Sequence, residues 1–435
     1  MSKLKFVVPI LVLIGLLILF DVYPFSYINP LPYLARYFGF AKEGSNIAYP
    51  EPVVTVHFAY PLGWREGDPL PEYHVRLIEK ARELGARYIR FDIWWSDIEP
   101  LNNTYNDDAI SYYRAVLETI ISYNMSPIVI IGTGYPEWLG AYFKLEEESN
   151  KTLSLDEISK LFRKLFTEIV SGETEANATE LRTGNQLVYN GLPVIQAKPR
   201  DSLYKKAEEY AYIIAENLGD LIYYYQLGNE LNHPITPISR ETVPLYIESL
   251  YNGVKKGDNN FETIINLYAG LFNWFLDADS WLNSLGDKVD IIAIDYYPGT
   301  WSPLNMLVDI TKNPPTGSGE SYFDDWGPLD ILINIAFKHN KKAAIIETGY
   351  STDPRSVDGE EYQGMFINKA FNKIIEIIEK RGFNLTFLGW YELADNPLAS
   401  IEVEKHFGIL HNDLSPKKAY PTLQQWFNKL SQEKP

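Results

Sequence analysis

Short apolar runs alternate with amphipathic segments along most of the chain, from about residue 53 to residue 430. The apolar runs are rich in β-branched and aromatic residues, which is typical of buried parallel strands. The segments between them mostly repeat apolar residues every three or four positions, which is typical of helices that cover a sheet. We expect strands at residues 53–58, 88–92, 126–132, 221–227, 264–270, 290–295, 343–347 and 385–390.

The same periodicity predicts helices at residues 71–84, 106–123, 202–218, 242–256, 329–339, 361–381 and 421–430. Eight strands, most of them followed by a helix, predict an α/β fold, a parallel (β/α)8 TIM barrel, because each parallel strand pair needs a crossover connection. A doubly wound open sheet is the structural alternative.

The longest connection joins the third and fourth expected strands and spans residues 137–220. One crossover needs far fewer residues. We expect a helix at residues 155–170 and a hairpin at residues 181–195 that turns at Asn190-Gly191. The excess, about residues 141–200, is predicted to be an insertion over the mouth of the barrel, where such folds carry insertions.

The start of the chain predicts export. Lys3 and Lys5 precede 15 uncharged, mostly apolar residues, 6–20. This run is shorter than the roughly 20 residues that span a bilayer, so it suits a signal peptide as well as an anchor. No small-x-small cleavage pattern follows it, which favours an uncleaved anchor. We expect residues 1–22 to be a signal-anchor or signal peptide, residues 23–52 a Pro-rich spacer and residues 53–432 an extracytoplasmic barrel, either membrane-anchored or secreted.

Two of the expected strands end in a glutamate. In YYYQLGNELN, residues 223–232, the apolar run stops at Gly228 and is followed by Asn229 and Glu230, and AAIIETGY, which starts at residue 343, delivers Glu347 in the same way. An ion at the edge of an apolar interior costs several kcal/mol unless it is paired or used. Two such carboxylates are what a glycosidase needs, one as acid and one as nucleophile. Closure of the sheet would turn both strand ends toward one mouth, which favours the barrel over the open sheet.

The composition of the chain limits the classes of ligand and cofactor that it can bind. The net charge of −18, from 39 basic and 57 acidic residues, disfavours nucleic acid as a partner and suits a neutral ligand. The absence of cysteine excludes disulfides, thiol catalysis and Cys-ligated metals. The 31 Tyr and 10 Trp suit stacking on the apolar faces of sugar rings. We expect no cofactor and no metal, since Asp353, Asp358 and Glu360 lack a calcium-loop pattern and suit a solvated acidic face.

From about residue 53 to residue 430 the chain resembles the clan A glycoside hydrolases, retaining enzymes on a (β/α)8 barrel. The motifs LGNEL and IIETGY and the order of the strands carry the resemblance. It implies that Glu230 is the acid/base, that Glu347 is the nucleophile, and that Asn229 binds the 2-hydroxyl of the reacting sugar. The expected activity is the cleavage of a β-linked oligo- or polysaccharide by double displacement.

The resemblance also implies roles for other residues. YIRFD places Arg90 where family 5 enzymes hold an arginine against the nucleophile, and DYYP offers Tyr296 or Tyr297 as the tyrosine that bonds the nucleophile; we favour Tyr297. LGWYE offers Trp390 as the platform under the sugar. The sequence GTGYPEWL, after the third strand, resembles families 39 and 42 and lacks the histidine usual in family 5. The individual family and the sugar therefore stay open.

Further aromatic and polar residues follow strand ends. We expect His57, Glu99, Trp95, Trp138 and Trp301 to contact substrate, and Trp94 and Trp274 are further candidates, since some of these five tryptophans should line further subsites. Each has a structural alternative. Arg90 could form a structural ion pair with Asp92, Asp97 or Glu99. Asn229 could serve only to form a turn. Each tryptophan could pack in the core instead of binding a sugar. Two other functions fit the same motifs: a membrane-tethered carbohydrate-binding protein on an inactive barrel, and a transglycosylase, in which a sugar hydroxyl replaces water.

Overall fold

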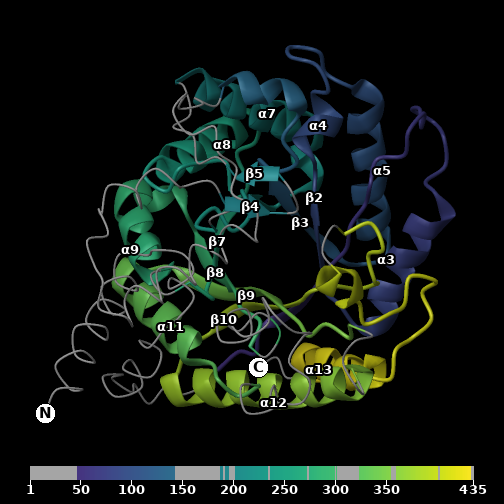
Figure 1. Ribbon diagram of the computed structural model, residues 1–435, viewed down its shortest axis with the longest axis vertical. Helices are drawn as coiled ribbons and strands as arrows, with labels where there is room; N and C mark the ends of the chain where they lie inside the picture. The colour runs from purple at the N-terminus through teal and green to yellow at the C-terminus, as the bar shows by residue number, and fades with distance from the viewer. Residues whose placement is uncertain are drawn as a thin grey trace, which may run out of the picture.

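The computed structural model describes residues 47–142, 187–189, 192–194, 201–233, 236–271, 274–298, 300, 323–353, 359–399 and 402–432. Eight parallel strands close into a barrel in the order β1-β10-β9-β8-β7-β6-β3-β2, and the helices surround it (Figure 1). Strand β1 pairs with both β10 and β2, so the sheet has no free edge. The expected (β/α)8 barrel is confirmed, and the open sheet was the wrong alternative.

The barrel strands fall where the apolar runs predicted them. They are β1 (Glu51–Thr55), β2 (Tyr88–Asp92), β3 (Ser126–Ile131), β6 (Tyr224–Leu227), β7 (Glu262–Tyr268), β8 (Ile291–Asp295), β9 (Lys342–Thr348) and β10 (Leu385–Trp390). The surrounding α-helices are α3 (Glu72–Leu84), α4 (Trp95–Ile98), α5 (Asp107–Ser122), α7 (Asp201–Leu218), α8 (Val243–Gly257), α9 (Trp274–Leu285), α11 (Gly327–His339), α12 (Gly359–Arg381) and α13 (Tyr420–Gln432).

Helix α9, between β7 and β8, is absent from the sequence-based prediction. Its buried residues, Trp274, Ala278, Trp281, Leu282 and Leu285, repeat at helical spacing. Trp274 is fully buried at the start of this helix and packs in the apolar layer between strands and helices, so its expected contact with substrate is wrong.

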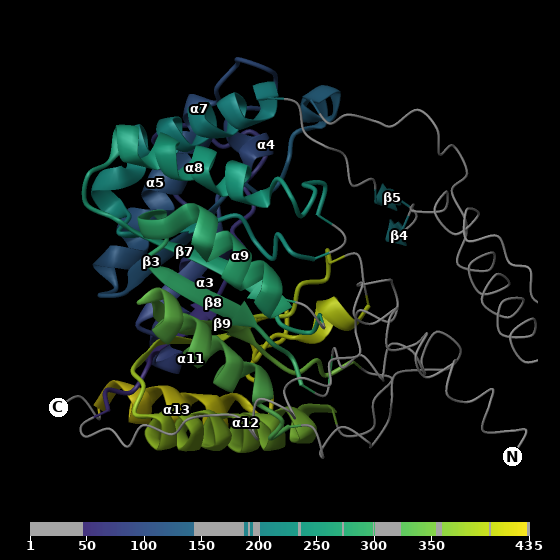
Figure 2. The ribbon, with the colours of Figure 1, turned by 90° about the vertical axis from the view of Figure 1, so that its left-hand side faces the viewer.

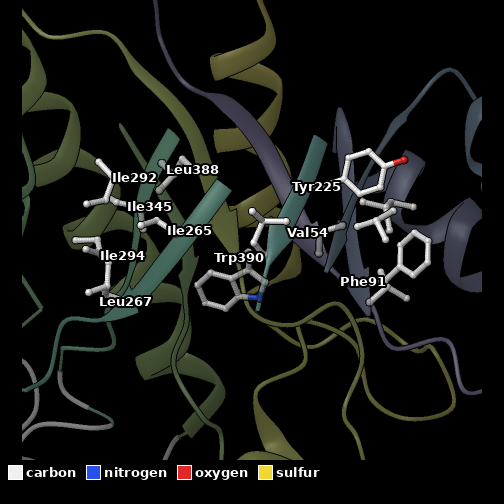
Figure 3. Packing of buried hydrophobic residues seen from close by; sticks show 14 of the residues in the cluster. Val54, Phe91, Tyr225, Ile265, Leu267, Ile292, Ile294, Ile345, Leu388 and Trp390 are labelled. Carbon is white, nitrogen blue, oxygen red and sulfur yellow. The ribbon is translucent and has the colours of Figure 1, made fainter. Parts of the chain in front are cut away.

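Side chains alternate between two apolar layers, as the period of a strand requires. The inner layer fills the barrel and consists of Val53, Ile128, Ile264, Ile291, Ala293, Ala344, Ile346 and Phe387. The outer layer lies between strands and helices, and Figure 3 shows part of it, including Val54, Phe91, Tyr225, Ile292 and Leu388. Because side chains alternate, each inner-layer residue is followed two positions later by another side chain that faces the axis.

The hairpin expected in the long insertion is present as a short antiparallel pair, β4 (Leu187–Tyr189) and β5 (Leu192–Val194), set apart from the barrel wall in Figure 2. Asn190 and Gly191 connect the two strands along the chain. The helix expected at residues 155–170 lies outside the described residues, as do residues 1–46, which include the apolar run. Among the helices that the structure describes, none has the length and apolarity to cross a membrane.

Candidate active site

The inward-facing positions become polar at the carboxyl ends of the strands, one step beyond the inner apolar layer. The side chains there are Thr55 of β1, Arg90 of β2, Gln226 of β6, Asn266 of β7 and Asp295 of β8, all buried. Each lies two residues after a side chain that belongs to the inner layer or packs against it. The alternation that builds the core therefore gathers these groups around the axis.

Glu347 reaches the axis by a different route. The pairing of β9 with both of its neighbours slips by one residue near its end: Ile345 pairs with Ile294, but Glu347 pairs with Asp295, and β10 shows a similar slip. One extra residue in β9 re-aims the side chain that follows it. Strict alternation would have sent Glu347 outward, because Ile346 already faces inward.

Arg90 connects the groups around the axis. Its Nη1 donates to Glu347 Oε1 at 2.5 Å and to Thr55 Oγ1 at 3.3 Å. Its Nε donates to Gln226 Oε1 at 2.7 Å and its Nη2 to Asn229 Oδ1 at 2.8 Å. The side chain is 1% exposed, so its charge and its donors are satisfied inside the protein. The salt bridge of Arg90 is with Glu347, across the barrel.

Tyr297 donates from its hydroxyl to the second oxygen of Glu347. Burial and the charge of Glu347 raise the pKa of Tyr297 well above its ordinary value, so the hydroxyl remains a donor. Tyr296 faces elsewhere and packs edge-on against Trp326, with the ring centroids 5.4 Å apart. The structure thus brings Tyr297, and not the Tyr296 ring, to the carboxyl group.

Asn229 and Glu230 follow β6. The Asn229 Oδ1 atom accepts from Arg90 and also from Asn266 Nδ2 at 2.7 Å and Gln226 Nε2 at 3.1 Å, which fixes the side-chain amide. Glu230 has φ 44°, a left-handed conformation that costs a non-glycine residue about 1 kcal/mol. Its N–H donates to Asn266 Oδ1 at 3.1 Å, which helps to hold this turn.

Three carboxyl groups meet at the mouth. One oxygen from each of Glu230, Asp295 and Glu347 lies within 4.8 Å of the others. Burial, and then the charge of Glu347, raise the pKa of Glu230 well above its ordinary value, which favours its protonated form. The sequence-based prediction did not include Asp295, although DIIAID places it inward by alternation. The trio has the composition of a metal site, but the Arg90 guanidinium already supplies a positive charge to Glu347.

Among known proteins, the similarity is to solved structures and not to sequences. No protein-family model matches the sequence, and no curated protein matches it. GH5_18 from Streptomyces cattleya, solved in complex with GlcNAc, matches with a TM-score of 0.59 and 12% identity over 90% of this chain and 82% of that chain. The β-glucosidase from Thermotoga maritima, in complex with deoxynojirimycin, matches with a TM-score of 0.54 and 14% identity over 90% of this chain and 99% of that chain. The fold is shared with glycoside hydrolases.

A third similar structure is a GH5_18 variant from Bifidobacterium longum subsp. longum in complex with Manβ1-4GlcNAc. It has a TM-score of 0.56 and 13% identity over 90% of this chain and 80% of that chain.

Trp390 does not lie at the mouth, contrary to expectation. It is fully buried in the outer layer, where its ring centroid is 6.2 Å from that of Phe366 of α12 (Figure 3). Phe387 belongs to the inner layer, so a residue three positions later on β10 faces outward. The next residue, Tyr391, faces the site: its ring centroid lies 6.1 Å from that of Tyr297 and 5.8 Å from that of His57.

Two of the other expected contacts, Trp95 and Glu99, are structural. Trp95 is fully buried, stacks on Tyr210 at 4.7 Å and donates to Glu99 Oε2 at 2.9 Å. Trp138 is half-buried, and its Nε1 donates to the carbonyl oxygen of Glu99 at 2.8 Å. Glu99 is itself fully buried. Trp94 is 45% exposed, which leaves it accessible. Trp301 lies outside the described residues.

His57 lies beside the site, just after β1. Its Nε2 atom is 3.2 Å from Glu392 Oε2, and its Nδ1 atom is 3.9 Å from Asp92 Oδ2. Burial alone would lower the pKa of His57, but the hydrogen bond and charge of Glu392 raise it to about 8. Glu392 is 1% exposed, so the imidazolium helps to compensate a buried carboxylate, on which the charge of Lys417 also acts.

The charge of His57 predicts a pH-dependent contribution to stability. Because the pKa of His57 is about 8 in the folded chain and 6.5 ordinarily, its contribution is full below pH 6.5 and is lost as the pH rises through 8. We expect His57→Gln, which imitates the neutral ring, to lower the melting temperature clearly at pH 6 and little at pH 9. Thermal scans at both values measure this.

The matched control is His411→Gln, because His411 pairs with Glu360 at 3.4 Å but is 45% exposed. An exposed pair contributes little, so we expect a small change at either pH. An equal loss at pH 6 and pH 9 for His57→Gln would show that His57 is uncharged.

Proposed function

We propose that the chain is a retaining glycoside hydrolase that cleaves a β-linked glycoside by double displacement. The observation that carries the proposal is the separation of Glu230 and Glu347, whose nearest carboxyl oxygens lie within 4.8 Å. Retaining enzymes hold the two groups about 5 to 5.5 Å apart, whereas inverting enzymes leave about 6.5 to 9.5 Å for a water molecule. Attack by water between the two groups is therefore disfavoured, and a carboxylate attacks instead.

The roles follow from the surroundings of each carboxyl group. Glu347, held by Arg90 and Tyr297, attacks the anomeric carbon while Glu230 gives its proton to the leaving oxygen. Glu230 is then a carboxylate and removes a proton from water, whose oxygen displaces Glu347 from the anomeric carbon. The raised pKa of Glu230 suits the first role, since the group must arrive protonated.

Substrate recognition is proposed to fall on the groups around these two carboxyls. Within the part of the chain that the structure describes, the hydrogen bonds of the Asn229 side chain fall on Oδ1, so the amide nitrogen can donate to the sugar 2-hydroxyl. Tyr391 offers a ring face and His57 a charged donor beside it. The similar structures hold GlcNAc, Manβ1-4GlcNAc and deoxynojirimycin, so gluco- and manno-configured β-glycosides are the first substrates to test.

We propose further that the enzyme acts outside the cytoplasm and is held to the membrane by residues 1–22. The lysine-flanked apolar run supports this. In cell fractionation we expect the full-length chain in the membrane fraction after a salt wash, and a variant without residues 1–22 in the soluble fraction. Recovery of a soluble chain that has lost the run would instead show cleavage.

Replacement of each carboxyl group should give a different kinetic result. Glu347→Ala should abolish turnover of every β-glycoside. Glu230→Ala should lose roughly 10² to 10⁴-fold on substrates whose leaving group needs a proton, and much less on activated aryl glycosides. Added azide should raise the rate of Glu230→Ala and yield a β-glycosyl azide, because azide attacks the glycosyl-enzyme without base assistance.

The control is Glu376→Ala, since Glu376 is an exposed residue of α12 that pairs with Lys373. It should match the parent chain. Full activity in Glu347→Ala would refute the assignment of the nucleophile. Sugar binding without turnover in the parent chain would favour a binding protein, and oligosaccharide products longer than the substrate would favour a transglycosylase.

A further inference from the structure

Asp295 is a third carboxyl group in the site, and the reaction proposed above does not use it. Its side chain is fully buried at the end of β8. Its Oδ2 atom accepts from Asn266 Nδ2 at 2.5 Å, whereas Oδ1 is buried and has no hydrogen-bond partner among the described residues. One of its oxygens lies within 4.8 Å of both Glu230 and Glu347. A buried acceptor without a donor is costly unless the group itself carries a proton.

The charges that face Asp295 require such a proton. Glu347 approaches from β9, Glu230 from the turn after β6, and Arg90 from β2, while Asn266 and Tyr297 are neutral. Three carboxyl groups thus share one guanidinium, which donates to Glu347. If all three were ionised, two buried negative charges would lack compensation. Glu404 adds a further negative charge near Glu230.

We propose that Asp295 remains a neutral carboxylic acid throughout the reaction and donates a hydrogen bond to Glu230, and so sets how strongly Glu230 holds its proton. This inference rests on the proposed function. Asp295 acts as a positioning residue, because its effect reaches the substrate only through Glu230.

Two observations indicate that Asp295 is the group that keeps its proton. Asp295 is fully buried, whereas Glu230 is partly exposed. The buried Oδ1 atom of Asp295 has no donor among the described residues, which disfavours the ionised form. Burial, then the charges of Glu347 and Glu230, raise the pKa of Asp295 well above its ordinary value, although Arg90 and the hydrogen bond from Asn266 oppose this rise. Apolar sites are known to keep a carboxylic acid neutral so that it can donate.

The proton of Asp295 stays in place while the others move. In the first step the bond from the anomeric carbon to the leaving oxygen breaks, the bond to Glu347 forms, and the proton of Glu230 goes to the leaving oxygen. Asp295 then donates to the new Glu230 carboxylate and stabilises it. In the second step Glu230 takes a proton from water, the water oxygen bonds to the carbon, and Glu347 leaves as a carboxylate.

Two substitutions of Asp295 by residues of similar shape distinguish a neutral hydrogen-bond donor at this position from an ionised carboxylate. Asp295→Asn keeps a neutral donor, so the apparent pKa of the alkaline limb in the pH profile of kcat/KM should stay within about 0.3 unit of the parent value. Asp295→Leu removes the donor and excludes water, so Glu230 should hold its proton to higher pH. The apparent pKa of that limb should then rise by about one unit. Melting temperatures check that both variants are folded.

A measurement of the protonation state of Asp295 without substrate tests this inference independently of the proposed function. Carbon NMR of the full-length chain labelled at aspartate carboxyl carbons, with the Asp295 signal assigned by its loss in Asp295→Asn, reports its protonation directly. We expect a protonated carboxyl group from pH 5 to pH 7. A neutral Asp295 in a chain that hydrolyses no β-glycoside would contradict the proposed function and leave the protonation state standing.

Three outcomes would overturn the inference. One is an ionised Asp295 at pH 6. Another is a fall of the alkaline limb by one unit or more in Asp295→Asn, since this would mean that a negative charge had been removed from beside Glu230. The third is an unmoved limb in folded Asp295→Leu, which would mean that Asp295 has only a structural role.

Discussion

The salt bridge between Arg90 and Glu347 is the interaction on which the site depends. The guanidinium lies near the barrel axis and bonds to groups from β1, β6 and β9 and from the turn after β6. A buried charge that loses its partner destabilises a protein by roughly 3 to 5 kcal/mol, so the fold and the site constrain each other here. The barrel must close for these distant segments to meet, and the charges need one another once it has closed.

Around this pair, a hydrogen-bond network of neutral side chains connects Arg90 to Glu230. Gln226 and Asn266 bond to each other at 2.9 Å, and both bond to Asn229. Asn266 also holds the backbone of Glu230 in its left-handed turn and reaches Asp295. The two glutamates differ because of these surroundings: a cation and a hydroxyl hold Glu347, whereas Glu230 faces a carboxyl group.

The features that local pattern encodes were predictable from the sequence. Apolar runs located the eight strands, and Glu230 and Glu347 stood out because each ends such a run. The motif LGWYE selects Trp390, whereas alternation from Phe387 selects Tyr391, because every second side chain of β10 faces the axis. The same alternation from Ala293 selects Asp295. The one-residue slip in β9 that turns Glu347 inward depends on how three strands pair, and so no local pattern encodes it.

The anomeric configuration of the first product tests the account most directly. Proton NMR during hydrolysis of a β-aryl glycoside shows which anomer forms before mutarotation. Direct attack by Glu347, followed by water from the opposite face, predicts that the β anomer appears first. An α anomer as the first product would mean that water attacks in a single displacement. It would contradict the role of Glu347 as the nucleophile.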